Sequence, residues 1–235
     1  MIDLLRFLLL LLILLPLKPA LANIGVQPMR LHVEAGKGSV VRVHSESPQP
    51  QYIQATLKRI VDPATEQEQE VDAREGSEAV VALTPSRFVL AAGSSRLVRV
   101  IALQPVQQET AYRVYFEGVR GPSEDDAEPI SDGARAQVGV SLVWGALLHV
   151  LPADGRVSLR HDGDRLHNDG TLRLGITQLH ACTASGSCSA HTIERSVYPG
   201  ASLPLPAEVA SAARLDIEYR LSRDGYRQHR MQLHP

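Results

Sequence analysis

The 235-residue chain has little of what usually supports catalysis or nucleic-acid binding. Cysteine occurs twice, aromatic residues make up 4% of the chain, and 24 basic residues nearly balance 26 acidic ones. A formal net charge of −2 gives no electrostatic footprint for DNA or RNA. We therefore expect no nucleic-acid partner.

Long apolar runs are also scarce. One occurs at residues 7–15 and is followed by Ala20-Leu-Ala22, and no later stretch is apolar enough to cross a bilayer. A short apolar run that ends in an Ala-x-Ala site is typical of a secretory signal peptide, whereas a membrane anchor needs about 20 apolar residues. We expect residues 1–22 to be removed on export and the rest to be soluble, with no stable membrane insertion.

Catalytic motifs are missing as well. The sequence has no Gly-x-Ser-x-Gly elbow, no His-Glu-x-x-His helix and no phosphate-binding glycine loop. The nine histidines are scattered, and none can be paired with a nucleophile. His149 lies in an apolar stretch and is predicted to be buried with a hydrogen-bond partner. The chain is expected to be no enzyme and to use no cofactor.

The two cysteines, Cys182 and Cys188, are six positions apart. In an oxidising compartment such a pair favours a disulfide. His180 and His191 flank the pair, so zinc is the alternative, although the spacing matches no common zinc pattern. A small-ligand or metal-binding sandwich built around these residues is therefore a further hypothesis for the chain.

Short runs of β-branched and alternating residues dominate the rest of the sequence, separated by glycine and proline turns. They lie at residues 39–44, 52–61, 78–83, 87–90, 96–101, 111–119, 136–144, 156–160, 164–167, 171–177, 202–205 and 215–221. This spacing is typical of β-sandwiches. Helix formers gather only at residues 207–214, enough for one or two turns.

A cluster of Pro, Asp and Gly at residues 151–155 separates two strand-rich regions. We place the domain boundary there, which gives domains at residues 23–152 and 153–235. The predicted fold class is all-β, with two tandem immunoglobulin-like sandwiches, the second smaller. The pair Asp169-Gly170 has the residue preference of a tight hairpin turn.

Four blocks occur in an order that resembles a known family. They are Leu83-Thr-Pro with residues 88–100, Tyr-Arg-Val-Tyr-Phe-Glu at 112–117, residues 138–152, and a tail block with Asn168-Asp-Gly, the two cysteines and Tyr198-Pro-Gly. Together they resemble the periplasmic pilus chaperones of the chaperone–usher pathway, especially the alpha-type branch that serves class 5 fimbriae. The resemblance covers essentially the whole chain after residue 22.

The resemblance implies a periplasmic protein that lends an edge strand to incomplete pilus subunits and delivers them to an outer-membrane usher. A lent strand must present alternate apolar side chains to the subunit. The residues that fit this role are Val138, Val140, Leu142 and Trp144. The same pattern would also suit a strand of the chain's own core, and from Val143 onward both faces are apolar, which favours the core there. An exposed apolar edge is an aggregation hazard, so a self-capping dimer is an alternative state of the free protein.

The resemblance also implies two basic residues that bind the C-terminal carboxylate of the subunit. Arg30 fits the first place. The second is a lysine five residues before the closing proline of the lent strand, where this chain has Leu147. Arg113, on a neighbouring predicted strand, is a substitute.

A structural pilus subunit or adhesin with tandem immunoglobulin-like domains is the main competing hypothesis. Such proteins carry a donor extension before their first domain. Here a strand is expected almost directly after residue 23, which argues against that hypothesis.

Overall fold

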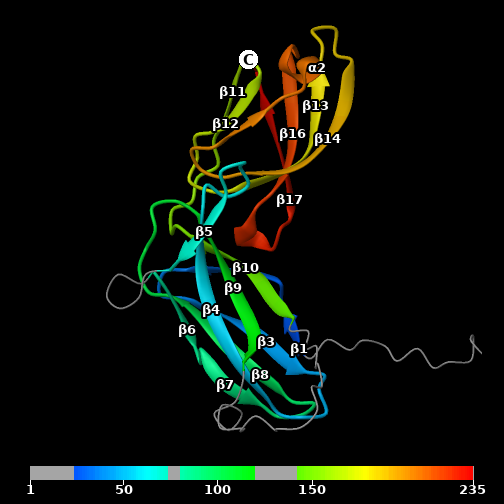
Figure 1. Ribbon diagram of the computed structural model, residues 1–235. Helices are drawn as coiled ribbons and strands as arrows, with labels where there is room; N and C mark the ends of the chain where they lie inside the picture. The colour runs from blue at the N-terminus through cyan, green and yellow to red at the C-terminus, as the bar shows by residue number, and fades with distance from the viewer. Residues whose placement is uncertain (1–23, 74–79, 120–141, 235) are drawn as a thin grey trace, which may run out of the picture.

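The computed structural model describes residues 24–73, 80–119 and 142–234, and strands dominate them. Four sheets form two β-sandwiches that follow one another along the chain. Figure 1 shows the first as the lower body, blue to green, and the second as the upper body, yellow to red. The predicted all-β class with two sandwiches is confirmed. Residues 1–22 lie outside the described part, within which no helix is long and apolar enough to cross a bilayer.

The first sandwich pairs a four-stranded sheet with a six-stranded one. The smaller sheet has the order β1 (Ile24–Gln27), β3 (Gly38–Ser45), β8 (Ser95–Ala102), β6 (Val81–Thr84). The larger has the order β2 (Arg30–Glu34), β10 (Val143–Leu151), β9 (Thr110–Val119), β4 (Gln51–Val61), β5 (Gln69–Asp72), with β7 (Arg87–Leu90) also paired to β4.

Alternation along these strands builds the core between the two sheets. Val41 and Val43 of β3 are fully buried while Val40, on the opposite face, is exposed, as the period of two in a strand requires. Phe116 of β9 and Leu148 of β10 cover them from the larger sheet and are also fully buried. Each such side chain stabilises the fold by about 1.5–3 kcal/mol.

The second sandwich has its own core, built around residues such as Leu166, Ile176 and Leu215. One sheet has the order β11 (Leu159–Asp162), β12 (Arg165–Asn168), β15 (Ser202–Pro204), and the other the order β14 (Cys188–Val197), β13 (Leu174–Cys182), β16 (Arg214–Arg220), β17 (Gln228–Leu233). A single helical turn, α2 (Ala207–Ala210), lies within the predicted helical segment, and a 3₁₀ turn, η2 (Ser222–Asp224), precedes β17.

The first segment of the described chain is shared between the two sheets of the first sandwich. β1 pairs with β3 in one sheet, and after the cis peptide bond Gln27–Pro28 the chain enters β2, which pairs with β10 in the other. A second cis bond precedes Pro85. The crossing brings Arg30, the first residue of β2, beside the middle of β10.

Three strands were not predicted from the sequence: β5, β14 and β17. All three are edge strands of their sheets, and most of their residues remain exposed or half-buried. An edge strand with little buried surface needs no apolar alternation, so its sequence carries a weak strand signal.

The hairpin predicted at Asp169-Gly170 is wrong. The strands on either side of it, β12 and β13, belong to different sheets, and the tight hairpin joins β11 to β12 instead. Gly163 supplies its left-handed residue, with φ of 60°. Gly170 instead donates its N–H to the side chain of the buried Asn168, and a Cβ there would lie 2.5 Å from the Arg156 carbonyl oxygen.

Candidate functional site

The most unusual strand edge in the first sandwich belongs to β10. β10 pairs antiparallel with β9 from Val143 to Val150 on one side. On its other side β2 pairs with it only from Leu147 onward. Among the described residues, no strand pairs with Val143–Ala146 on that side. As far as the described residues go, the backbone N–H and C=O groups of this stretch are therefore open to a strand from another chain.

Exposed apolar side chains lie at the same place. Leu142 and Val143 are 48% and 52% exposed, although bulky aliphatic residues are usually covered. The prediction that the chain enters its own core from Val143 onward is therefore wrong for Val143 itself. Core packing begins with Trp144, which is half-buried against the core, and is complete at Ala146.

Trp144, Ala146 and Leu148 share one face of β10 because side chains alternate along a strand. Leu142 precedes β10 and continues the same spacing of two. This face covers the chain's own core at Ala146 and Leu148 and runs out beyond that core at Leu142. Val138 and Val140, the other two predicted donor residues, lie outside the described residues. The predicted strand at residues 136–144 overlaps β10 only at Val143 and Trp144, because β10 begins at Val143 and continues to Leu151.

The predicted basic residues meet on the opposite face of β10. Leu147 is the register partner of Arg30 in β2 and of Arg113 in β9, so the three side chains form one row across the sheet. Leu147 therefore stands between the two arginines, where the family pattern has a lysine. It packs against Ile60 and against Tyr198 of the second sandwich.

Arg113 is already paired within the chain. Its guanidinium lies 2.6 Å from the Glu70 carboxylate and 3.9 Å from that of Glu68, and Tyr115 also donates to Glu70. Burial disfavours the charged guanidinium, but Tyr115 and Glu70 outweigh it and raise the pKa of Arg113. Gly145 makes room for this group, because a Cβ there would lie 3.0 Å from the Arg113 and Tyr115 side chains.

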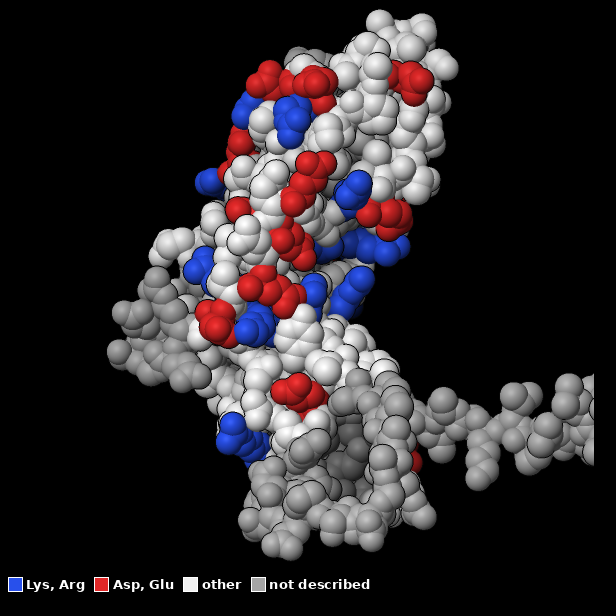
Figure 2. Space-filling model, in the orientation of Figure 1, with Lys and Arg blue, Asp and Glu red and all other residues white. Residues whose placement is uncertain are grey.

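A cavity of about 150 Å³ lies beside this row, in the cleft between the two sandwiches. Arg30, Arg113, Leu147 and Ile60 line it from the first sandwich, and Arg173, Ser196, Tyr198 and Tyr226 from the second. Figure 2 shows basic side chains gathered at this waist, with acidic ones beside them. Arg173 and Tyr226 were not predicted from the sequence, since neither belongs to a recognisable motif.

One buried carboxylate connects the two sandwiches at the cleft. Glu109 is 3% exposed and accepts hydrogen bonds from the Arg173 backbone N–H and the Ser222 hydroxyl, at 2.8 and 2.7 Å. Its Oε1 also lies 2.8 Å from Nδ1 of His149. The prediction that His149 is buried is confirmed. Glu109 thus joins β10 to two segments of the second sandwich.

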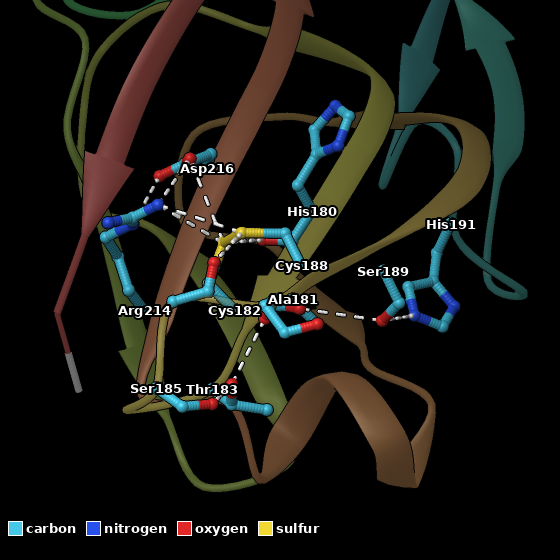
Figure 3. Close-up of a disulfide and its surroundings, with 12 residues drawn as sticks. His180, Ala181, Cys182, Thr183, Ser185, Cys188, Ser189, His191, Arg214 and Asp216 are labelled. Carbon is cyan, nitrogen blue, oxygen red and sulfur yellow. Dashed lines mark hydrogen bonds and ion pairs between the residues drawn. A yellow bond between two sulfur atoms is a disulfide. The ribbon is translucent and has the colours of Figure 1, made fainter.

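The disulfide between Cys182 and Cys188 is formed, as predicted. The two residues are register partners at the end of the β13–β14 hairpin. Figure 3 shows His180 and His191 directed away from the sulfur atoms; His180 lies 3.7 Å from Glu218, and His191 is hydrogen-bonded to Ser189. With both sulfur atoms in the disulfide, the pair offers no thiolate ligands to a zinc ion.

Comparison with known proteins gives a consistent result. No family model matches the sequence. The chain is 30% identical over 192 residues to a CS1 fimbrial subunit of Escherichia coli, and the match covers 78% of this chain and 80% of that protein. The name of that relative leaves open whether it is a pilus building block or an assembly factor.

The solved structures decide between these two. The crystal structure of the class 5 fimbriae chaperone CfaA matches 91% of this chain and 100% of its own, with a TM-score of 0.74 and 25% identity. The chain belongs to the periplasmic pilus chaperones of the chaperone–usher pathway. It is therefore a non-enzymatic pilus chaperone with two immunoglobulin-like domains, and the structural-subunit hypothesis is set aside.

A second match, at TM-score 0.71 and 24% identity, is to the chain of a chaperone–tip adhesin complex of CFA/I fimbriae biogenesis. It covers 90% of this chain and 98% of that one. At this identity the match bears on the fold alone.

Proposed function

We propose that this chaperone binds and caps pilus subunits by donor-strand complementation and delivers them to an outer-membrane usher. The open edge of β10 at Val143–Ala146 carries the proposal. A subunit strand that pairs there completes the hydrogen bonds of β10, and the exposed apolar face that begins at Leu142 fills the groove of the subunit.

Leu142→Asp tests strand donation. The substitution removes an apolar contact worth about 1.5–3 kcal/mol and places a charge in the interface, so recovery of co-expressed subunits should fall by at least about tenfold. The measurement is the amount of subunit that copurifies with the chaperone from the periplasm, using the pilus subunits encoded beside it.

Leu97→Asp is the matched control. Leu97 is also 48% exposed but lies on β8 in the other sheet, so its replacement should leave capture unchanged. Equal capture by the Leu142→Asp variant and the wild type would refute strand donation at this edge.

We also propose that the row Arg30–Leu147–Arg113 lies at the place where the C-terminal carboxylate of the subunit binds. A strand added to the open edge of β10 lies in line with β2, whose first residue is Arg30. The end of the added strand therefore meets the cleft. A carboxylate there gains charge-assisted hydrogen bonds from guanidinium groups.

Arg30→Ala combined with Arg113→Ala should weaken subunit capture by about tenfold or more, because each charge-assisted hydrogen bond contributes about 1.5–3 kcal/mol. Capture is measured as for Leu142→Asp. If the double variant captures as much subunit as the wild type, the carboxylate lies elsewhere.

Delivery to the usher is proposed from the family alone. The purified chaperone–subunit complex should bind the usher in a pull-down, and the subunit-free chaperone should bind less. Equal retention of both would contradict selective delivery of loaded chaperone.

A further inference from the structure

Tyr226 lies close to two arginines from different domains. The guanidinium carbons of Arg30 and Arg173 each lie 5.9 Å from the centre of its ring. Tyr226 holds this position with φ of 64°, directly after Gly225 with φ of 75°. A left-handed backbone is costly for a residue other than glycine, and here it places the ring in the cleft.

Arg173 is well anchored, but one of its donors is free. Its Nε and Nη2 donate to the Ser196 hydroxyl, at 3.1 and 2.6 Å. Its Nη1 is buried and makes no hydrogen bond with any described residue. Gly175 provides the space, since a Cβ there would lie 2.8 Å from the guanidinium. The group is thus held in place with one donor unused.

Tyr226 contributes a second unused group. Its hydroxyl is buried and has no well-aligned hydrogen bond to the described residues. Ser222, whose own hydroxyl donates to Glu109, is near enough to interact with it. Arg173 and Tyr226 line the same cavity as Arg30. A buried polar group left without a partner costs about 1–3 kcal/mol, so two such groups at one cavity indicate a missing acceptor.

The charge around this cavity favours an anion. Arg113 has carboxylate partners in Glu68 and Glu70. Within the described part of the chain, neither Arg30 nor Arg173 has an ion-pair partner. A carboxylate has two acceptor oxygens, which suits two guanidinium groups and a hydroxyl.

We propose that Arg173 and Tyr226 of the second domain, together with Arg30 of the first, bind the C-terminal carboxylate of the captured subunit. This rests on the proposed function and extends its anchor from one domain to both. The subunit terminus then bridges the cleft, and a bound subunit also fixes the two domains relative to each other.

The test compares two synthetic peptides with the sequence of the C-terminal strand of a subunit encoded beside the chaperone. One ends in the free carboxylate and the other in an amide, and fluorescence anisotropy gives the affinity for each. The wild type should prefer the free acid by about tenfold or more. Arg173→Gln should abolish most of this preference while binding of the amide peptide changes little.

Arg165→Gln is the matched control. Arg165 donates to the Ser202 hydroxyl through Nε and another guanidinium nitrogen, as Arg173 does to Ser196, but it lies outside the cavity. This variant should keep the preference for the free acid. Tyr226→Phe removes only the hydroxyl and should reduce the preference severalfold, which keeps the test decisive if Arg173→Gln does not fold.

The outcomes separate the two proposals. A preference that is present in the wild type and unchanged in a folded Arg173→Gln variant overturns this inference alone, as does an unchanged preference in Tyr226→Phe if Arg173→Gln is unfolded. A wild type with no preference, or with no binding of either peptide, overturns the carboxylate anchor as well. Strand donation is judged separately by Leu142→Asp.

Discussion

At the scale of residues, we expect the polar groups buried at the domain junction to make the stability of the fold depend on pH. His149 is fully buried beside Glu109, and its ring stacks on Tyr198 and meets the edge of Tyr226. Burial disfavours the imidazolium and outweighs the attraction of Glu109, so the pKa of His149 lies below its ordinary value of 6.5. Nearby Arg173 and His32 act in the same direction. His149 is therefore neutral in the folded protein at neutral pH.

This predicts a loss of stability in mild acid. As the pH falls below about 6.5, His149 takes up a proton in the unfolded chain but not in the folded one, so the free energy of unfolding falls by up to about 1.4 kcal/mol per pH unit. Urea unfolding at several pH values between neutrality and mild acid measures this slope. His149→Gln should flatten it, and an identical slope in the variant would show that other groups cause the dependence.

At the scale of elements, the β13–β14 hairpin is stabilised both by a disulfide at its end and by core packing along β13. The disulfide closes a short loop at the hairpin end, where Arg214 donates toward Cys182 and binds Asp216. The core side chains Ile176 and Leu179 of β13 are fully buried. Packing therefore holds β13 in the domain, while the disulfide constrains its exposed end.

Replacing both cysteines by alanine should cost about 2 kcal/mol, since the closed loop is short and the loss of loop-closure entropy is small. Thermal unfolding of the variant and of the reduced wild type measures this cost. Subunit capture should be unchanged because the hairpin end lies at the top of the second sandwich in Figure 1, away from the open edge of β10 in the first. Loss of the folded second domain on reduction would contradict this prediction.

At the scale of the whole molecule, the open edge of β10 is a liability in the free chaperone. Backbone groups that no described strand pairs with lie next to exposed Leu142 and Val143, and both features favour pairing with another copy. The fold offers this edge only on the side that β2 leaves uncovered. A second copy can therefore occupy the place that we propose for the subunit.

We predict that the subunit-free chaperone forms a concentration-dependent dimer, and that Leu142→Asp shifts it to the monomer. Sedimentation equilibrium measures this, with Leu97→Asp as the control that should still dimerise. A wild type that stays monomeric at all accessible concentrations would contradict the prediction. The charge introduced at Leu142 would be buried in such a dimer, which is unfavourable without a partner.

Much of the fold was predictable because its causes are local. Strands β3, β4, β7, β8 and β9 were predicted to within one residue, since each buries one face and alternates accordingly. The disulfide was also predictable, because residues six apart readily meet across a hairpin. Edge strands such as β14, which bury little, were not.

The site was predictable only in part. Arg30 and Arg113 were found through the resemblance to pilus chaperones, and the structure brings them to either side of Leu147. Arg173, Tyr226 and Glu109 carry no signal in the sequence, because an arginine, a tyrosine or a glutamate beside a strand is usually an ordinary surface residue.

The sequence by itself determined the all-β class and the family resemblance, since these depend on neighbouring residues and their order. It also predicts an export signal at residues 1–22, for the same reason. Only the tertiary structure decided where β10 leaves its own core and which charges face the cleft. The cleft joins residues from position 30 to position 226. Their meeting depends on strand register and on the packing of one domain against the other, which no local pattern encodes.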